Sequence, residues 1–205
     1  MKGRTVAILA LLAGLGLALL VAANQLLAGR IEAGRQAADE RALLDLLPAG
    51  SYDNHPLTRP IPLPPSELLG SPPPPSAWLA TREGVPVAVL LPATAKGYEG
   101  PIRLLLAIRP DGRLLAMKVL GHRETPGIGD RMEPARSPWL RTFTDASLAG
   151  HPEAEWRVKA DNGQFDQIAG ATITSRAVVS ATQHALQFFD GHRQQLLGSA
   201  GQASP

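Results

Sequence analysis

The 205-residue chain contains no cysteine, and this absence excludes several kinds of redox protein. Without thiolates, the chain cannot ligate an iron–sulfur cluster through cysteine, attach a c-type haem through a C-x-x-C-H segment, or form disulfides. Any redox role must therefore depend on another kind of cofactor.

Charged and aromatic residues are also scarce, at 19% and 4% of the chain, and the formal net charge is only +2. No run of lysine or arginine interleaved with aromatic residues occurs. Nucleic-acid binding requires a concentrated basic surface, so we expect no nucleic-acid partner. Apolar residues make up 44% of the chain, which is enough for one domain with a hydrophobic core.

The N-terminus holds one long hydrophobic run. Residues 6–23 are all apolar or glycine, and no charge follows until Arg30. As a helix, this uncharged stretch spans roughly 35 Å, which is enough to cross a bilayer. Because Lys2 and Arg4 precede it, residues 1–29 are predicted to form a cytoplasmic tail and a transmembrane anchor, with the remainder of the chain exported. A cleaved signal peptide is the alternative, but its apolar region is usually only about 7–15 residues long.

Residues 30–77 are predicted to connect the anchor to a globular domain. An amphipathic helix is expected over residues 31–47 and is ended by Pro48 and Gly50. Nine prolines then follow between positions 55 and 76, which favours polyproline-like or irregular chain. We interpret this Pro-rich segment as a stiff spacer or as chain lying along the domain surface.

A globular domain of the α+β class is predicted over residues 78–191. Pro110-Asp111-Gly112 is typical of a turn joining two apolar runs into a hairpin, and Pro86 favours an edge strand or a strand start. Apolar residues spaced by three and four up to Phe189 predict a final helix packed on the sheet, and a disordered tail is expected over residues 192–205. The predicted strands are residues 85–91, 102–108, 114–120 and 156–158.

A hydroxyl-rich segment immediately precedes the predicted final helix. Residues 169–174 read Ala-Gly-Ala-Thr-Ile-Thr and are followed by Ser175. Small residues let another group approach the backbone closely, and a helix N-terminus offers unpaired N–H groups and a positive dipole to an anion. The pattern therefore places the Thr174 hydroxyl where a phosphate can be held. An ordinary helix N-cap is the alternative interpretation.

Three segments in a fixed order resemble a known family. They read Gly-Tyr-Glu-Gly at residues 97–100, His-Arg-Glu-Thr-Pro-Gly-Ile-Gly-Asp at residues 122–130, and the hydroxyl-rich segment with Ser175. Together they resemble the FMN-binding domain shared by the RnfG-type and NqrC-type flavin subunits of bacterial ion-translocating respiratory complexes. The resemblance runs from about residue 97 to residue 189, and residues 127–133 are more similar to the RnfG type.

The resemblance implies a covalent flavin. In this family the last threonine of a Ser/Thr-Gly-Ala-Thr-x-Thr motif carries FMN through a phosphoester bond, and here that residue is Thr174. Ala169 replaces the hydroxyl residue that often begins the motif. An ordinary solvated acid is the alternative role for Glu124, and no metal site is expected. The remaining cofactor-binding residues implied by the resemblance are Gly170, Ala171, Thr172, Ser175, Glu124, Thr125, Pro126, Gly127 and Gly129.

The implied function is electron transfer within a membrane complex of the Rnf type, which couples electron flow between ferredoxin and NAD to ion transport. The expected partners are the other subunits, the bacterial inner membrane, with the domain on its periplasmic side, and a flavin transferase that uses FAD and releases AMP. No complete catalytic activity is expected of the isolated protein. The alternatives are an NqrC-like subunit of a sodium-pumping quinone reductase, a self-contained flavin reductase, and a cofactor-free anchored module of the cell envelope.

Overall fold

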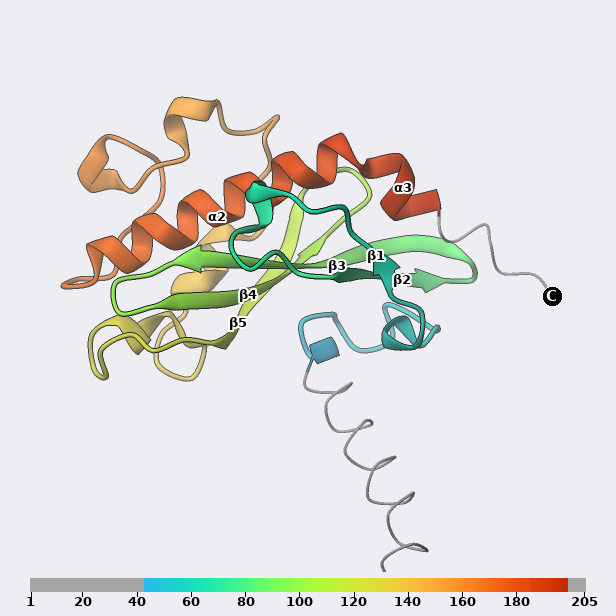
Figure 1. Cartoon of the computed structure of the whole chain (residues 1–205), viewed down its shortest axis with the longest axis horizontal. Coiled ribbons are helices and arrows are strands. Elements are labelled where there is room, and N and C mark those ends of the chain that lie inside the picture. Colours follow the sequence, from blue (N-terminus) through green and yellow to red (C-terminus); the bar gives the residue numbers. More distant parts are fainter. Residues whose placement is uncertain (1–42, 199–205) are drawn as a thin grey trace, which may run out of the picture. The chain divides into compact units, whose positions relative to one another are not determined.

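A computed structural model describes residues 43–198 (Figure 1). The chain divides into two compact units, residues 1–45 and 46–205, and every helix and strand named below belongs to the second. The predicted transmembrane anchor and most of the predicted amphipathic helix lie outside the described residues. Within residues 43–198, no helix has both the length and the apolar character needed to cross a membrane.

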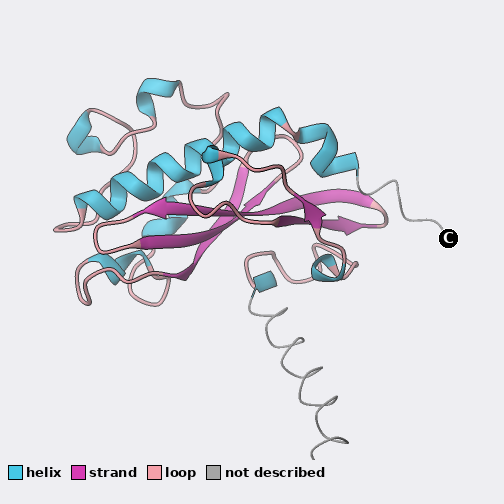
Figure 2. Cartoon of the chain, in the orientation of Figure 1, coloured by secondary structure: helices cyan, strands magenta, loops and turns pink. Residues whose placement is uncertain are grey.

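The domain is built on a five-stranded antiparallel sheet in which each strand pairs with the next along the chain (Figure 2). The predicted hairpin is confirmed, since Leu106 pairs with Met117 and the turn contains Gly112 at a φ of 84°. Five consecutive residues of the fourth strand, 104–108, are fully buried, so this strand is covered on both faces. The strands are β1 (Ile61–Pro62), β2 (Ser76–Arg82), β3 (Val85–Lys96), β4 (Pro101–Ile108) and β5 (Leu114–Gly121).

Strand β3 is longer and more central than the sequence predicts. An edge strand is one possibility for residues 85–91, yet β3 has 12 residues and pairs with both β2 and β4. Pro86 pairs only with β2, at Thr81, and Pro92 pairs only with β4, at Leu105. Both prolines therefore lie where β3 has a single neighbour, and the missing N–H is tolerated at such positions.

The final helix is confirmed as α2 (Thr172–Gly191), which packs on β3 and β4. Its buried apolar residues include Val178, Leu186, Phe188 and Phe189, at the predicted helical spacing. Burying each such large side chain contributes about 1.5–3 kcal/mol. The predicted α+β class is thereby confirmed for the domain, and α2 is anchored along its length by the core.

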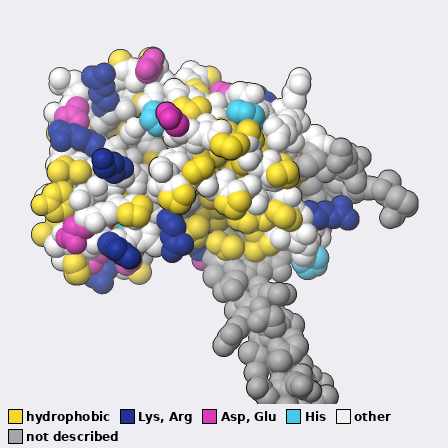
Figure 3. Space-filling model, in the orientation of Figure 1, with side chains coloured by type: hydrophobic (Ala, Val, Ile, Leu, Met, Phe, Trp, Pro, Cys, Tyr) yellow, Lys and Arg dark blue, Asp and Glu magenta, His cyan; other side chains and the backbone are white. Residues whose placement is uncertain are grey.

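The Pro-rich segment is part of the domain, so the spacer interpretation is wrong. It contains two short 3-10 helices, η1 (Pro56–Thr58) and η2 (Glu67–Leu69), and η2 contacts both α2 and β3. Leu69 is fully buried, and Ile61 of β1 pairs with Ala77. Apolar side chains gather over the middle of the face where this segment crosses the domain (Figure 3). Single apolar residues between prolines have no periodicity, so the sequence pattern does not reveal their burial.

Two further expectations are wrong. Residues 193–198 form a short helix, α3 (Arg193–Gly198), in the stretch predicted to be a disordered tail, and its Leu196 is fully buried. The predicted strand at residues 156–158 is absent from the described chain, where only an isolated bridge joins Val158 to Phe165. Residues 129–161 instead contain four 3-10 helices: η3 (Gly129–Met132), η4 (Trp139–Phe143), η5 (Glu153–Glu155) and η6 (Lys159–Asp161).

An aromatic cluster explains why residues 129–168 stay compact without strands. The ring of Phe165 stacks on Phe143, with centroids 4.8 Å apart, and on Trp156, with centroids 4.9 Å apart. Trp139 packs edge-on against Phe143, and its indole N–H donates to the carbonyl of Asp166. Aromatic packing of this kind holds the chain that leads directly into the hydroxyl-rich segment.

Candidate functional site

Three segments far apart in the sequence meet at one end of the sheet (Figure 1). They are the β3–β4 turn at residues 97–100, the loop after β5 at residues 122–128, and the N-terminus of α2. Between them lies a pocket of about 340 Å³, within the range of about 300–1,000 Å³ typical of small-molecule sites. Its lining consists of Tyr98, Glu124, Thr125, Ile128, Gly129, Gly170, Ala171, Thr172, Ile173 and Thr174.

Thr174 and Glu124 form a buried pair in this pocket. Thr174 lies in the first turn of α2 and is 2% exposed, and its hydroxyl donates a hydrogen bond to the carboxylate of Glu124. Glu124 is 4% exposed, so its interpretation as a solvated acid is wrong. The carboxylate also accepts the backbone N–H groups of Tyr98, at 3.2 Å, and Glu99, at 3.1 Å. Three donors thus satisfy a carboxylate whose burial is otherwise costly.

Two glycines leave the space that the Glu124 side chain fills. A Cβ atom on Gly97 would overlap the carboxylate oxygen Oε1, and a Cβ atom on Gly129 would lie 2.6 Å from the Cβ of Glu124. Gly97 also donates its N–H to the carbonyl of Gly100, which closes the β3–β4 turn. The carboxyl group is therefore held by close backbone contact on two sides, which fixes where it points.

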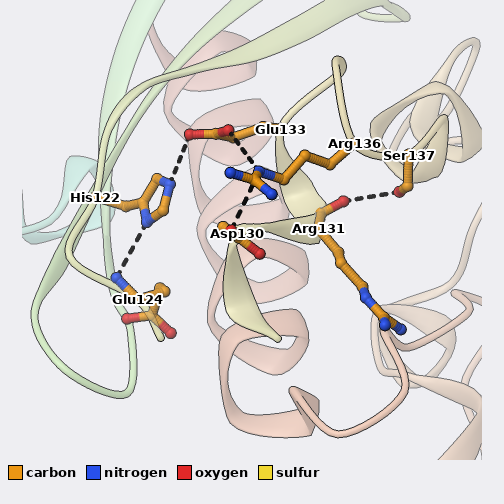
Figure 4. A network of polar contacts seen from close by, with 7 residues as sticks. All are labelled: His122, Glu124, Asp130, Arg131, Glu133, Arg136 and Ser137. Carbon is orange, nitrogen blue, oxygen red and sulfur yellow. Dashed lines mark hydrogen bonds and ion pairs between the residues drawn. The ribbon is translucent and has the colours of Figure 1, made fainter. Parts of the chain in front are cut away.

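A polar network holds the loop after β5 (Figure 4). His122 Nδ1 accepts the backbone N–H of Glu124 at 3.0 Å, so the proton of the neutral ring lies on Nε2. Nε2 then donates to the carboxylate of Glu133 at 3.0 Å. Arg136 pairs with Glu133 at 3.4 Å and with buried Asp130 at 3.1 Å. The backbone at Glu124 is thereby tied to the chain that follows η3.

The N-terminus of α2 faces the same pocket without a side-chain cap. Its N-cap is Ala171, and the first turn contains no acidic residue. The first N–H groups of a helix have no partner inside the helix, so they are available to an anion. Gly170 precedes the cap at a φ of 82°, a conformation that favours glycine. The ordinary N-cap interpretation does not hold for Thr174, whose hydroxyl bonds to Glu124 instead.

Ser175 stabilises the turn instead of lining the pocket. Its fully buried hydroxyl accepts the N–H of Ile168 at 2.9 Å and donates to the carbonyl of Ala171 at 2.9 Å. These two bonds fix the chain on both sides of Gly170. Pro126 and Gly127, also predicted to contact the cofactor, lie in the loop after β5 but do not line the pocket.

Three large side chains at the pocket were missed by the site prediction. Tyr98, Ile128 and Ile173 line it and remain 66%, 44% and 50% exposed. Each one occurs inside a segment that carries the family resemblance. A bulky residue placed between glycines or hydroxyl residues is the sequence signal that could have identified them as pocket residues. Together they give the pocket an apolar rim suited to a flat aromatic ligand.

An exposed ion pair fixes the chain that leads into the motif. Arg176 of α2 contacts the Asp161 carboxylate at 2.6 Å and holds the pKa of that carboxyl below its ordinary value. Lys159 pairs with Asp166 at 2.7 Å on the same stretch. Within residues 43–198, no group of three or more histidine, aspartate or glutamate side chains is arranged to hold a metal ion.

Known proteins are similar to this chain over the segments that form the pocket. Residues 97–187 match the family model of the FMN-binding domain, a range that includes all three pocket segments. The G subunit of the ion-translocating oxidoreductase complex of Pseudomonas aeruginosa is 47% identical over 195 residues, 95% of this chain and 91% of the relative. The corresponding G subunit of Vibrio cholerae is 37% identical over 92% of this chain and 90% of its own length. The crystal structure of Shewanella oneidensis NqrC is similar in fold, with a TM-score of 0.50, 22% identity and 75% of each chain covered.

Proposed function

Because this chain belongs to the family of G subunits of ion-translocating oxidoreductase complexes, we propose that it is an FMN-bearing electron carrier within such a complex. The observation that carries the proposal is the pocket at the uncapped N-terminus of α2, where the Thr174 hydroxyl meets the Glu124 carboxylate. The proposed partners are the other subunits of a membrane-associated complex.

The pocket residues fit the two chemically different parts of FMN. The N-terminus of α2 suits the phosphate, because an anion there gains about 0.3–1 kcal/mol from the helix dipole, and backbone N–H groups add direct hydrogen bonds. Gly170 presents no side chain in the approach to the helix. The apolar rim of Tyr98, Ile128 and Ile173 suits the flat isoalloxazine ring. When bound, FMN supplies reversible electron acceptance, and nearby charges and hydrogen bonds tune its potential.

We further propose that FMN is attached covalently, as a phosphoester of Thr174. Thr174 is the only hydroxyl side chain within the described residues that both lines the pocket and bonds to Glu124. Covalent attachment prevents loss of the cofactor by dissociation on the exported side of a membrane, which is where the apolar run at residues 6–23 is proposed to place the domain. A flavin transferase that uses FAD and releases AMP would complete the protein there.

The test is in-gel fluorescence of the full chain, expressed in cells with an active flavin transferase and run under denaturing conditions. We expect a fluorescent band that is lost in Thr174→Ala and retained in Thr144→Ala, which removes an exposed threonine hydroxyl outside the pocket. Mass analysis of the tryptic peptide covering residues 160–176 then identifies the modified residue.

Two outcomes contradict the proposal. A dark wild-type band overturns the covalent attachment, and it is the result that a cofactor-free binding module of the cell envelope would give. Turnover of NADH at enzyme-like rates by the isolated protein supports a self-contained flavin reductase instead of a carrier.

A further inference from the structure

We propose that Glu124 is the general base that activates Thr174 for its own flavin attachment. The inference rests on the proposed function, because it assigns a role in making the phosphoester proposed above. It concerns how the cofactor is installed and is independent of how electrons later pass through it.

The step is a transfer of the FMN group from FAD. The Thr174 oxygen attacks the phosphorus on the riboflavin side of the FAD pyrophosphate, a new O–P bond forms, and the bond to the AMP phosphate breaks. AMP leaves with the bridging oxygen, and the proton of the Thr174 hydroxyl passes to Glu124. No electrons are gained or lost, and the flavin transferase supplies the bound FAD.

The hydrogen bond between Thr174 and Glu124 already joins the donor and the acceptor of this proton. The hydroxyl donates to Oε2 of the carboxylate, which is the arrangement a general base needs before it removes a proton. An alcohol is a weak nucleophile unless an adjacent base activates it. Among the side chains that line the pocket in the described part of the chain, Glu124 carries the only carboxylate. Glu124 is therefore the base that this chain supplies.

The surroundings hold the carboxylate toward Thr174. The backbone N–H groups of Tyr98 and Glu99 bind its two oxygens, and His122 binds its backbone N–H. The absent side chains of Gly97 and Gly129 allow this close packing. Such fixed placement is typical of groups that act on a reacting atom, whereas a glutamate that served only as surface charge would not require it.

Charge balance supports the same role. Before transfer, the pocket holds one negative charge on Glu124. After transfer, the phosphodiester carries one negative charge, and the proton kept by Glu124 makes that carboxyl neutral. In the product, the phosphodiester therefore does not face a second negative charge on Glu124, a pairing that would be strongly unfavourable in a buried site.

The experiment measures flavin transfer to the full chain, purified in detergent from cells without flavin transferase and then mixed with the transferase and FAD. We expect Glu124→Gln to slow the appearance of in-gel fluorescence by about 10²–10⁴-fold, the usual contribution of general acid–base catalysis. Glu153→Gln, which removes an exposed carboxylate outside the pocket, should leave the rate unchanged. Thermal unfolding curves show whether each variant is folded.

Chemical rescue separates a base from a merely structural carboxylate. Glu124→Ala leaves a space beside Thr174, and added formate should raise its transfer rate in proportion to formate concentration, while chloride should not. A Glu124→Gln rate within about threefold of wild type overturns the inference. A folded Glu124→Ala variant that formate does not rescue also overturns it. If wild type itself stays dark with active transferase, the proposed covalent attachment fails; if wild type is labelled, only the role of Glu124 is at issue.

Discussion

The carboxyl group of Glu124 is enclosed by backbone and by one hydroxyl instead of by water. Its neighbours come from three segments, and each makes a contact that depends on a particular residue type: a glycine at position 97, a glycine at position 129 and a threonine at position 174. Substitutions at these positions should therefore disturb the site far more than the change in side-chain volume alone suggests.

Gly129→Ala should separate Glu124 from Thr174. The new Cβ atom would lie 2.6 Å from the Cβ of Glu124, so the glutamate must shift. Overpacking of this kind costs about 1–3 kcal/mol of unfolding free energy, and we expect slower flavin attachment as well. Urea unfolding and in-gel fluorescence measure the two effects. Gly191→Ala is the matched control, because a Cβ atom there meets nothing within 4 Å. Unchanged stability and labelling in Gly129→Ala would mean that the packing around Glu124 can accommodate an added methyl group.

At the scale of elements, α2 joins the site to the core. Its first turn carries Thr174 at the pocket, and its later turns bury Phe188 and Phe189 against the domain core. A long helix fixed by its apolar face is rigid, so the position of Thr174 relative to β3 and β4 is set by packing some distance from the site. The exposed Arg176, two residues after Thr174, adds a link from α2 to η6.

The contribution of the pair between Arg176 and Asp161 should depend on pH. Arg176 lowers the pKa of Asp161, so the folded state binds this proton less readily than the unfolded state, whose carboxyl titrates near 3.8. The stabilisation is therefore present above pH 3.8 and is lost as the pH falls further, through the folded pKa. Because the pair is exposed, we expect Arg176→Ala to lower Tm only slightly at pH 7.

Thermal melts of a double-mutant cycle test this pair. Asp161→Asn should remove the effect of Arg176→Ala at pH 7, and the two single variants should approach wild type in strongly acidic buffer. A Tm difference for Arg176→Ala that persists in the Asp161→Asn background would assign the effect to another partner.

At the scale of the whole molecule, the domain begins well before its first long strand. The Pro-rich segment contributes Ile61 and Leu69 to the core, and α3 contributes Leu196. Sheet, helix and both flanking segments therefore share one hydrophobic core. A fragment restricted to residues 78–191 would lack part of that core, so we expect it to be less stable than the domain with both flanking segments.

Leu69→Ala tests whether the Pro-rich segment supports the fold. Leu69 is fully buried where η2 meets α2 and β3, and truncating a buried leucine costs about 2–5 kcal/mol. Chemical denaturation should show this loss as a lower urea midpoint. Leu68→Ala is the matched control. The Leu68 side chain is only partly buried, so its truncation should lower the stability clearly less. An effect of Leu69→Ala no larger than that of Leu68→Ala would restore the spacer interpretation.

Local sequence patterns by themselves determined the β4–β5 hairpin, the helix α2 and the three segments that show the family. Each is visible within about ten to twenty residues, because turn chemistry and helical periodicity are short-range properties. The alternation of prolines with single apolar residues carries no such signal, and neither does the six-residue α3. The central position of β3 also depends on its partners on both sides.

Only the tertiary structure decided how the site is assembled. Glu124 and Thr174 are 50 positions apart, and nothing local to either residue indicates that the carboxylate is buried and accepts the hydroxyl's hydrogen bond. The exposed apolar rim of Tyr98, Ile128 and Ile173 likewise exists only because a turn, a loop and a helix N-terminus meet. Residue type and spacing identified the Thr174 hydroxyl as a candidate, whereas its chemical environment comes from chain segments that packing alone brings together.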